Sequence, residues 1–319
     1  MSLSQMQVFN DFAYLTYTET LRQQIELFNA ASGGSLVLSS VANTGDFSEE
    51  AFYKKLSTVT RRRDPYATGV VAPVSLTQDN HVAVKVAGGT PPIAFDPAQF
   101  AWIQKSPEEA GIVIGEQLSK GILADQVNSS VAALQAALAN TAAVNYDATA
   151  GTLTLNALNR GAAMFGDRAM DIKTWVIHST PMHDLFDTAL TNGNDLFKFG
   201  DVAIIQDGFG RRFVMTDSPS LFNATASPDQ YSTLGLSEGA AIVEDNGDLY
   251  TNIEESNGDE NINRTFQAEY SFNLKLKGFA WDKASGGKAP NDAEIATGSN
   301  WDQVATDAKD LAGVVVTSQ

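Results

Sequence analysis

The stretch from Asn156 to Pro219 constrains the fold more than any other part of the chain. Its apolar spacing predicts, in order, a helix, a short strand, a second helix and a β-hairpin, at 158–165, 172–177, 180–190 and 202–217. The run DGFG at 207–210 is a Gly-rich turn between the last two strands. This order predicts a compact α/β unit rather than a catalytic loop.

The same order of motifs resembles the axial domain of tailed-phage major capsid proteins of the Hong Kong 97 type. The motifs are a helix ending in Gly-Asp, a strand ending in His-Ser, a D-G-x-G-R turn and a strand ending in T-D-S-P. Two further stretches carry the resemblance, SPEEAGIVIGEQLSKGI and FNLKLKGFAWDKASGGKAPNDAEIATGSNWDQV with KDLAGVVV after it. The resemblance implies an α+β capsid fold with an axial domain, a peripheral domain with a long spine helix and long β-strands, an extended β-hairpin loop and an N-terminal arm.

Changes of pattern and the resemblance together divide the chain into five parts. They are an N-terminal arm at 1–57, an extended loop at 58–96, a peripheral domain with the spine helix at 97–150, an axial domain at 151–262, and a return to the peripheral domain with closing strands at 263–319. Within the arm, the apolar spacing predicts one or two helices at 4–29 and another at 46–56. The resemblance implies that the arm crosses neighbouring subunits; a helix packed within its own subunit is the open alternative.

The extended loop consists of β-branched runs separated by polar turns, and such a ribbon cannot form a large core alone. The resemblance implies that it lies over the next subunit. Arg61, Arg62 and Arg63 form a basic cluster that could clamp a neighbour's carboxylates bidentately or be merely solvated. The other candidate interface residues of this part are Asp64, Asp79, His81 and Lys85.

A long helix is predicted from Ser106 to Asn140, on the order of 50 Å at ~1.5 Å per residue. Ser106 to Glu109 reads as a capping box with Pro107 in the first turn. Gly111, Gly115 and Gly121 predict a bend in its first half. A coiled coil is disfavoured because sustained heptads are missing. Two groups complete the candidate interface. At the start of the helix they are Glu108 and Glu109. At the hairpin, which the resemblance places at the ring centres, they are Asp207, Phe209, Arg211 and Arg212.

The C-terminal part begins with an acidic, Gly- and Asn-rich stretch at 245–263. Its carboxylates do not have EF-hand spacing, so a solvated surface loop is predicted. Strict alternation at 265–277 then predicts a strand longer than the usual five or six residues. A short helix at 291–296 and a closing strand at 314–317 follow.

The composition and the lack of catalytic motifs limit what the chain can bind and catalyse. The chain has 319 residues, a net charge of -17 and no cysteine. Such a charge repels phosphate backbones, so contact with packaged DNA is expected to be loose and non-specific. No catalytic motif is present, and His178 and His183, five apart with Pro181 between them, do not share a helix face. We therefore predict no enzyme activity, no metal and no cofactor.

The resemblance implies a major capsid protein that self-assembles into pentamers and hexamers of an icosahedral head around phage double-stranded DNA. The implied location is the virion, assembled in the host bacterial cytoplasm. The implied partners are other copies of the chain, a separate scaffolding protein, a portal protein and a decoration or cement protein, with no membrane.

Two further expectations and two alternatives accompany this interpretation. Because the arm begins close to Met1, no processed pro-segment is expected. Some relatives lock neighbours with a Lys–Asn crosslink, for which Lys85 and Asn300 are suitable residue types; none is assumed. The alternatives are an encapsulin-like shell around cargo protein and a metal-dependent hydrolase that uses His178 and His183.

Overall fold

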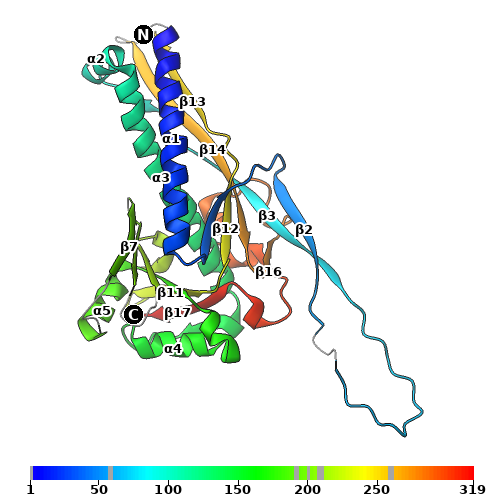
Figure 1. Ribbon diagram of the computed structural model, residues 1–319. Coiled ribbons are helices and arrows are strands. Elements are labelled where there is room, and N and C mark those ends of the chain that lie inside the picture. The colour runs from blue at the N-terminus through cyan, green and yellow to red at the C-terminus, as the bar shows by residue number, and fades with distance from the viewer. Residues whose placement is uncertain (1–2, 57–59, 190–193, 200–201, 207–211, 258–261) are drawn as a thin grey trace.

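The computed structural model describes residues 3–56, 60–189, 194–199, 202–206, 212–257 and 262–319. The molecule is elongated. Two long helices and a long β-hairpin form one end, a second sheet with shorter helices forms the other, and a loop projects from the middle (Figure 1). This mixture of helices and sheets confirms the predicted α+β class.

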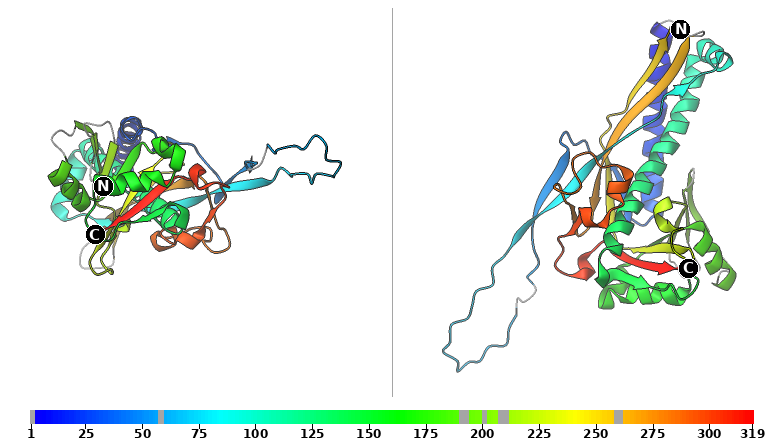
Figure 2. Two further views of the ribbon diagram at one scale, coloured as in Figure 1. Left: turned by 90° about the horizontal axis from the view of Figure 1, so that it is seen from below. Right: turned by 180° about the vertical axis from the view of Figure 1, so that it is seen from behind.

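The long helices are α1, Leu3–Ala31, and α3, Pro107–Ala139. They lie side by side (Figure 2), and Phe9, Ala13 and Tyr17 of α1 are buried. The N-terminal helix therefore packs against its own chain, and its predicted contact with neighbouring subunits stays a prediction. No helix in the described ranges has the length and apolar character that a membrane crossing needs.

Gly111 and Gly115 allow the close approach of these helices. A Cβ atom at Gly111 would lie 2.8 Å from the carbonyl oxygen of Phe9, and one at Gly115 would lie 2.7 Å from that of Ala13. Since α3 is one uninterrupted helix, these glycines serve the contact with α1.

The predicted capping box at Ser106 is wrong. The Ser106 side chain makes no capping hydrogen bond, because a further helix, α2 at Pro97–Lys105, ends at this residue. The Ser106 N–H donates to the carbonyl of Trp102 inside α2, at 3.0 Å. Ser106 is therefore the joint between two helices.

The first sheet is built around one long strand, β14. Its order is β1-β12-β14-β3-β2, and β13 and β4 also pair with β14. The strands are β1 Leu36–Ser40, β2 Phe47–Tyr53, β3 Gln78–Gly89, β4 Ile93–Ala94, β12 Ala241–Asp245, β13 Tyr250–Ser256 and β14 Asn263–Leu276. Phe266, Phe272 and Leu274 of β14 are buried, which confirms the long alternating strand.

Two predictions about this sheet are wrong. The helix predicted at 46–56 is the strand β2, paired antiparallel with β3. The backbone ladder with β3 holds this segment extended, and Glu49 and Glu50 add ion pairs with Lys283 and Lys275. The loop predicted at 245–263 contains β13, because this segment finds a complete set of backbone partners along β14.

The second sheet has the order β5-β17-β11-β6-β9-β8-β7, with β10 paired to β11. Its strands are β5 Asn145–Asp147, β6 Thr174–Ile177, β7 Asn194–Phe199, β8 Val202–Gln206, β9 Arg212–Thr216, β10 Phe222–Asn223, β11 Gln230–Leu236 and β17 Gly313–Ser318. The helices α4, Leu155–Ala163, and α5, Ser179–Ala189, lie at this end of the molecule (Figure 1). The predicted helix–strand–helix–hairpin order is confirmed; β7 was not predicted.

A small two-stranded unit joins the sheets. β15, Phe279–Trp281, pairs with β16, Trp301–Gln303, and the predicted short helix is α6, Asp292–Ile295, capped by Asn291. The rings of Trp281 and Trp301 meet edge to face with centroids 4.8 Å apart. Both tryptophans are buried, so this pair anchors the intervening loop.

The pairing of the strands does not follow the predicted domain boundary between residues 262 and 263. β12 and β13 precede that boundary but pair with β14 in the first sheet. β17 follows it but pairs with β11 and β5 in the second sheet. Backbone pairing therefore crosses the predicted boundary in both directions, and the division of the chain into peripheral and axial domains stays a prediction.

Candidate assembly surfaces

The candidate interface residues lie in separate regions of the molecule. Arg61 to Asp64 belong to the loop between β2 and β3, here called the projecting loop and defined as residues 54–77. Glu108 and Glu109 begin α3 at the far end of the long helices, and Arg212 begins β9 in the second sheet (Figure 1). The candidates among the described residues therefore do not form a single site.

Residues 60–77 of the projecting loop are exposed, and the loop extends far from the rest of the chain (Figure 2). Arg61, Arg62 and Arg63 form no ion pair with any described residue, and Asp64 accepts a hydrogen bond from the Tyr66 N–H at 2.9 Å. Large apolar side chains on it are exposed: Tyr66, Val70, Val71, Val74 and Leu76. The β-branched runs at 70–76 form no strand, so these side chains have no sheet to cover them.

Ion pairs hold the base of the projecting loop. Lys54 pairs with Asp79 across the loop at 2.8 Å, and this hydrogen bond lowers the pKa of Asp79. Lys55 reaches Asp310 at 3.5 Å. Together with the pairs of Glu49 and Glu50, these contacts connect the loop base to the body of the chain.

His81 serves the sheet. Its Nε2 lies 2.6 Å from the carbonyl oxygen of Leu276, so Nε2 carries the proton and donates it. Nδ1 is buried without a hydrogen-bond partner, and burial lowers the pKa of the imidazole. The neutral ring therefore fastens β3 to the end of β14.

Lys85 also has a partner in its own chain. Its ammonium group lies 3.6 Å from Asp248, whose carboxylate accepts hydrogen bonds from the N–H and hydroxyl of Ser271. Asn300 is buried and donates to the carbonyl of Glu294 at 2.9 Å. Both residue types considered for a crosslink thus have intrachain partners.

Two tyrosine–aspartate hydrogen bonds fasten the long helices to the first sheet. Tyr17 of α1 donates to Asp245 of β12 at 3.3 Å, and Tyr270 of β14 donates to Asp125 of α3 at 2.7 Å. Burial raises the pKa of both carboxyl groups and of both phenols. No sequence motif marks these pairs, because their members lie far apart along the chain.

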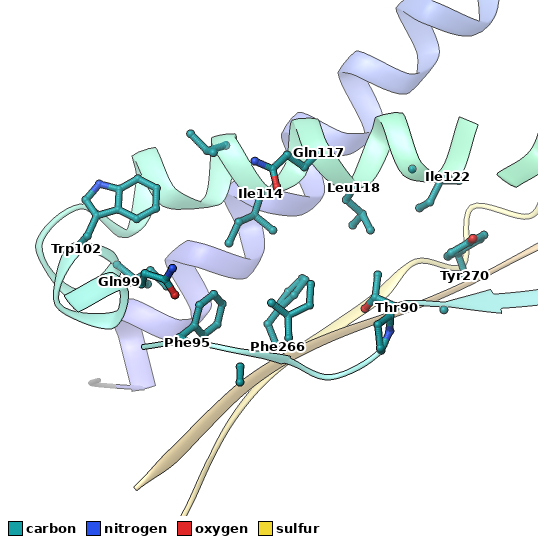
Figure 3. Close-up of a pocket in the computed structure, with 17 residues that line it drawn as sticks. Thr90, Phe95, Gln99, Trp102, Ile114, Gln117, Leu118, Ile122, Phe266 and Tyr270 are labelled. Atoms are coloured by element: carbon teal, nitrogen blue, oxygen red, sulfur yellow. The ribbon is translucent and has the colours of Figure 1, made fainter. Parts of the chain in front are cut away.

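A cavity of about 590 Å³ lies at the far end of the long helices, between α2, α3, β4 and β14. We call it the α2 cavity. Figure 3 shows Phe95 and Phe266 on one side, facing Ile114 and Leu118 of α3. Trp102 stands at its edge with 38% of its surface exposed. This apolar cavity was not predicted, since α2 itself was not predicted.

The hairpin between β8 and β9 has the predicted antiparallel pairing. Asp207, Phe209 and Arg211 lie outside the described residues. Arg212 donates from one guanidinium nitrogen to the carbonyls of Ala30 and Ala31, at 2.9 and 3.0 Å. Its positive charge thus caps the C-terminal end of α1, where the helix dipole favours a cation.

The histidines of the hydrolase alternative do not form a metal centre in the described residues. His178 lies 3.6 Å from Asp217 and packs against the ring of Tyr231, with centroids 5.3 Å apart. His183 is exposed. Nowhere in the described ranges do three or more histidines or carboxylates gather as metal ligands would.

Several solved phage capsid structures are similar to this chain. The Cyanophage Pam1 capsid asymmetric unit matches with 12% identity and a TM-score of 0.49, over 86% of this chain and 85% of that chain. The acid-stable capsid of Helicobacter pylori bacteriophage KHP30 matches with 10% identity and a TM-score of 0.48, over 89% and 88%. The capsid of Ralstonia phage GP4 matches with 10% identity and a TM-score of 0.46, over 90% and 87%. None of the curated proteins compared with the chain matches it.

A family model gives the decisive comparison. The model of the Gp13-like family, described as major capsid protein 13-like, matches residues 5–315. This match spans both sheets, the long helices and the projecting loop, and it confirms the resemblance noted in the sequence. The chain therefore belongs to the major capsid protein 13-like family and is a major capsid protein, a structural component of the phage head.

Proposed function

We propose that the chain forms homo-pentamers and homo-hexamers that close into an icosahedral head around double-stranded DNA, and that it does so without catalysing a reaction. The projecting loop is the observation that carries this proposal. Its apolar side chains are exposed; Tyr66, for example, shows 92% of its surface. Contiguous exposed apolar surface on a soluble protein usually marks an interaction site.

In the proposed arrangement, the second sheet is the axial domain and its β8–β9 hairpin faces the ring centre. The first sheet and the long helices form the peripheral domain, and the projecting loop reaches a neighbouring subunit. This placement is supported by the elongated shape, which puts the hairpin end and the α2 end far apart (Figure 1).

The proposed partners follow from a shell function. They are other copies of this chain, a separate scaffolding protein, a portal protein and a decoration or cement protein, in a head assembled in the host cytoplasm. Packaged DNA is held by confinement, with loose contact only, because the net charge of -17 disfavours binding to phosphates.

Electron microscopy of the purified chain, with size-exclusion chromatography alongside, tests the proposal. We expect closed shells, or rings of five and six subunits. A monodisperse monomer, even when the scaffolding protein is supplied, would contradict it.

A further inference from the structure

We infer that the α2 cavity of one subunit receives the projecting loop of a second copy, and that Arg61 to Arg63 of the loop pair there with Glu108 and Glu109. This inference rests on the proposed shell function and adds a specific receptor to it.

The α2 cavity is built to receive apolar side chains. Its walls include Phe95, Ile103, Leu118 and Phe266, and its volume of about 590 Å³ lies in the usual range of binding pockets, about 300–1,000 Å³. Trp102 is partly exposed at its edge, so the cavity communicates with the surface. Such a cavity excludes a highly charged occupant from its interior.

The projecting loop offers a matching occupant. Val70 and Val74 are exposed although both are apolar, and nothing in the described part of their own chain covers them. The projecting loop extends away from α2, which lies at the far end of the long helices and forms one wall of the α2 cavity (Figure 1). A chain therefore does not fill its own cavity, and a second copy supplies the loop.

The charges beside the two surfaces are complementary. The described loop residues 60–77 contain three arginines and one aspartate, whereas residues 97–116 beside the cavity contain three glutamates and one lysine. Glu108 and Glu109 are exposed in the first turn of α3, and neither forms an ion pair with a described residue. Arginine clusters and carboxylates pair well because guanidinium groups bind carboxylates bidentately.

This contact has a consequence for symmetry. Because the loop and the cavity are different surfaces on each chain, their contact is heterologous, and such contacts generate closed rings when the rotation closes. A dimer with two-fold symmetry would instead need a self-complementary patch. The inferred contact is thus compatible with the rings proposed above.

Charge reversal tests the pairing directly. One variant carries Arg61→Glu, Arg62→Glu and Arg63→Glu, a second carries Glu108→Arg and Glu109→Arg, and a third combines all five. Each of the first two should lower the yield of closed particles about tenfold or more at low salt, since like charges meet at the contact. The combined variant should recover most of the yield.

The control reverses exposed charges elsewhere. Asp229→Arg with Asp302→Arg changes the net charge as the second variant does, and both side chains are exposed. It should assemble as the wild type does, and an unchanged urea midpoint in every variant shows that folding is intact. The inference is overturned if either reversal leaves the yield unchanged or if the combined variant shows no recovery. In both cases wild-type shells would still support the proposed function.

Cysteine crosslinking tests the apolar part, because the chain has no cysteine of its own. Val113 of α3 lines the α2 cavity. Particles assembled from a mixture of Val74→Cys and Val113→Cys subunits should form a crosslinked dimer with a bismaleimide, and particles of either variant alone should not. Crosslinking of Val74→Cys to itself, or no crosslink in the mixture, would contradict the inference. Particles that form normally but lose a decoration protein after reversal of Glu108 and Glu109 would assign the cavity to that protein instead.

Discussion

Replacing Gly115 by alanine should weaken the contact between the two long helices. The added Cβ would lie 2.7 Å from the carbonyl oxygen of Ala13, a distance that real Cβ atoms essentially never show. That oxygen belongs to the backbone of α1, so it cannot rotate away and the helices must separate. Overpacking of this kind costs about 1–3 kcal/mol.

The same substitution also favours the helix, by about 1 kcal/mol for alanine over glycine. A second glycine of α3 separates the two effects. A Cβ at Gly121 meets nothing within 4 Å, so Gly121→Ala gains the helix propensity without the clash. We expect Gly115→Ala to be less stable than the wild type by up to about 2 kcal/mol and Gly121→Ala to be more stable by up to about 1 kcal/mol.

Urea unfolding of the unassembled subunits, at a concentration where size-exclusion chromatography shows no particles, measures this difference. Assembly must be avoided because association stabilises the folded state by mass action. If Gly115→Ala proves as stable as Gly121→Ala, the close approach of α1 and α3 is not as described.

Three further substitutions test other contacts. Arg212→Ala should lower the free energy of unfolding by about 1–2 kcal/mol, because two carbonyls at the end of α1 lose a charged donor; an unchanged urea midpoint would contradict this. Trp301→Ala should cost about 3–5 kcal/mol, measured as a lowered thermal midpoint, since it removes the buried partner of Trp281. Burial raises the pKa of Asp245, so the folded chain keeps this proton to a higher pH than the unfolded chain does. Stability should therefore fall as the pH rises from about 3.9 through the raised pKa, and urea unfolding at several pH values should show a smaller fall in Asp245→Asn, in which only Asp125 of the two tyrosine-bound carboxyl groups remains.

The sequence predicted best the elements whose pattern is long and regular. The helix of α3 and the strand of β14 were recognisable because each repeats its apolar spacing over many residues, so local errors do not change the assignment. The α4–β6–α5 order was recognisable for a related reason, since caps and turns separate its short elements.

Elements decided by distant contacts could not be predicted in the same way. The apolar spacing of β2 indicated a helix, but its backbone pairs with β3, and Lys275 and Lys283, far along the chain, pair with its glutamates. The α2 cavity depends on four segments that meet only in three dimensions, with Trp102 and Phe266 among its walls. Likewise, the intrachain roles of His81 and Lys85 depend on partners that no local pattern reveals.

The position of β14 in the first sheet affects the order of events during translation. β14 lies between β12 and β3, yet it begins only at Asn263, and β17 takes its place between β5 and β11 still later. Until the ribosome has added these strands, each sheet lacks one of its internal strands. The α2 cavity then also lacks the wall that Phe266 and Tyr270 provide. A nascent chain therefore cannot present a finished cavity to other subunits. In the inferred assembly, lateral association through this cavity therefore waits until synthesis is nearly complete, which protects growing chains on one polysome from joining prematurely.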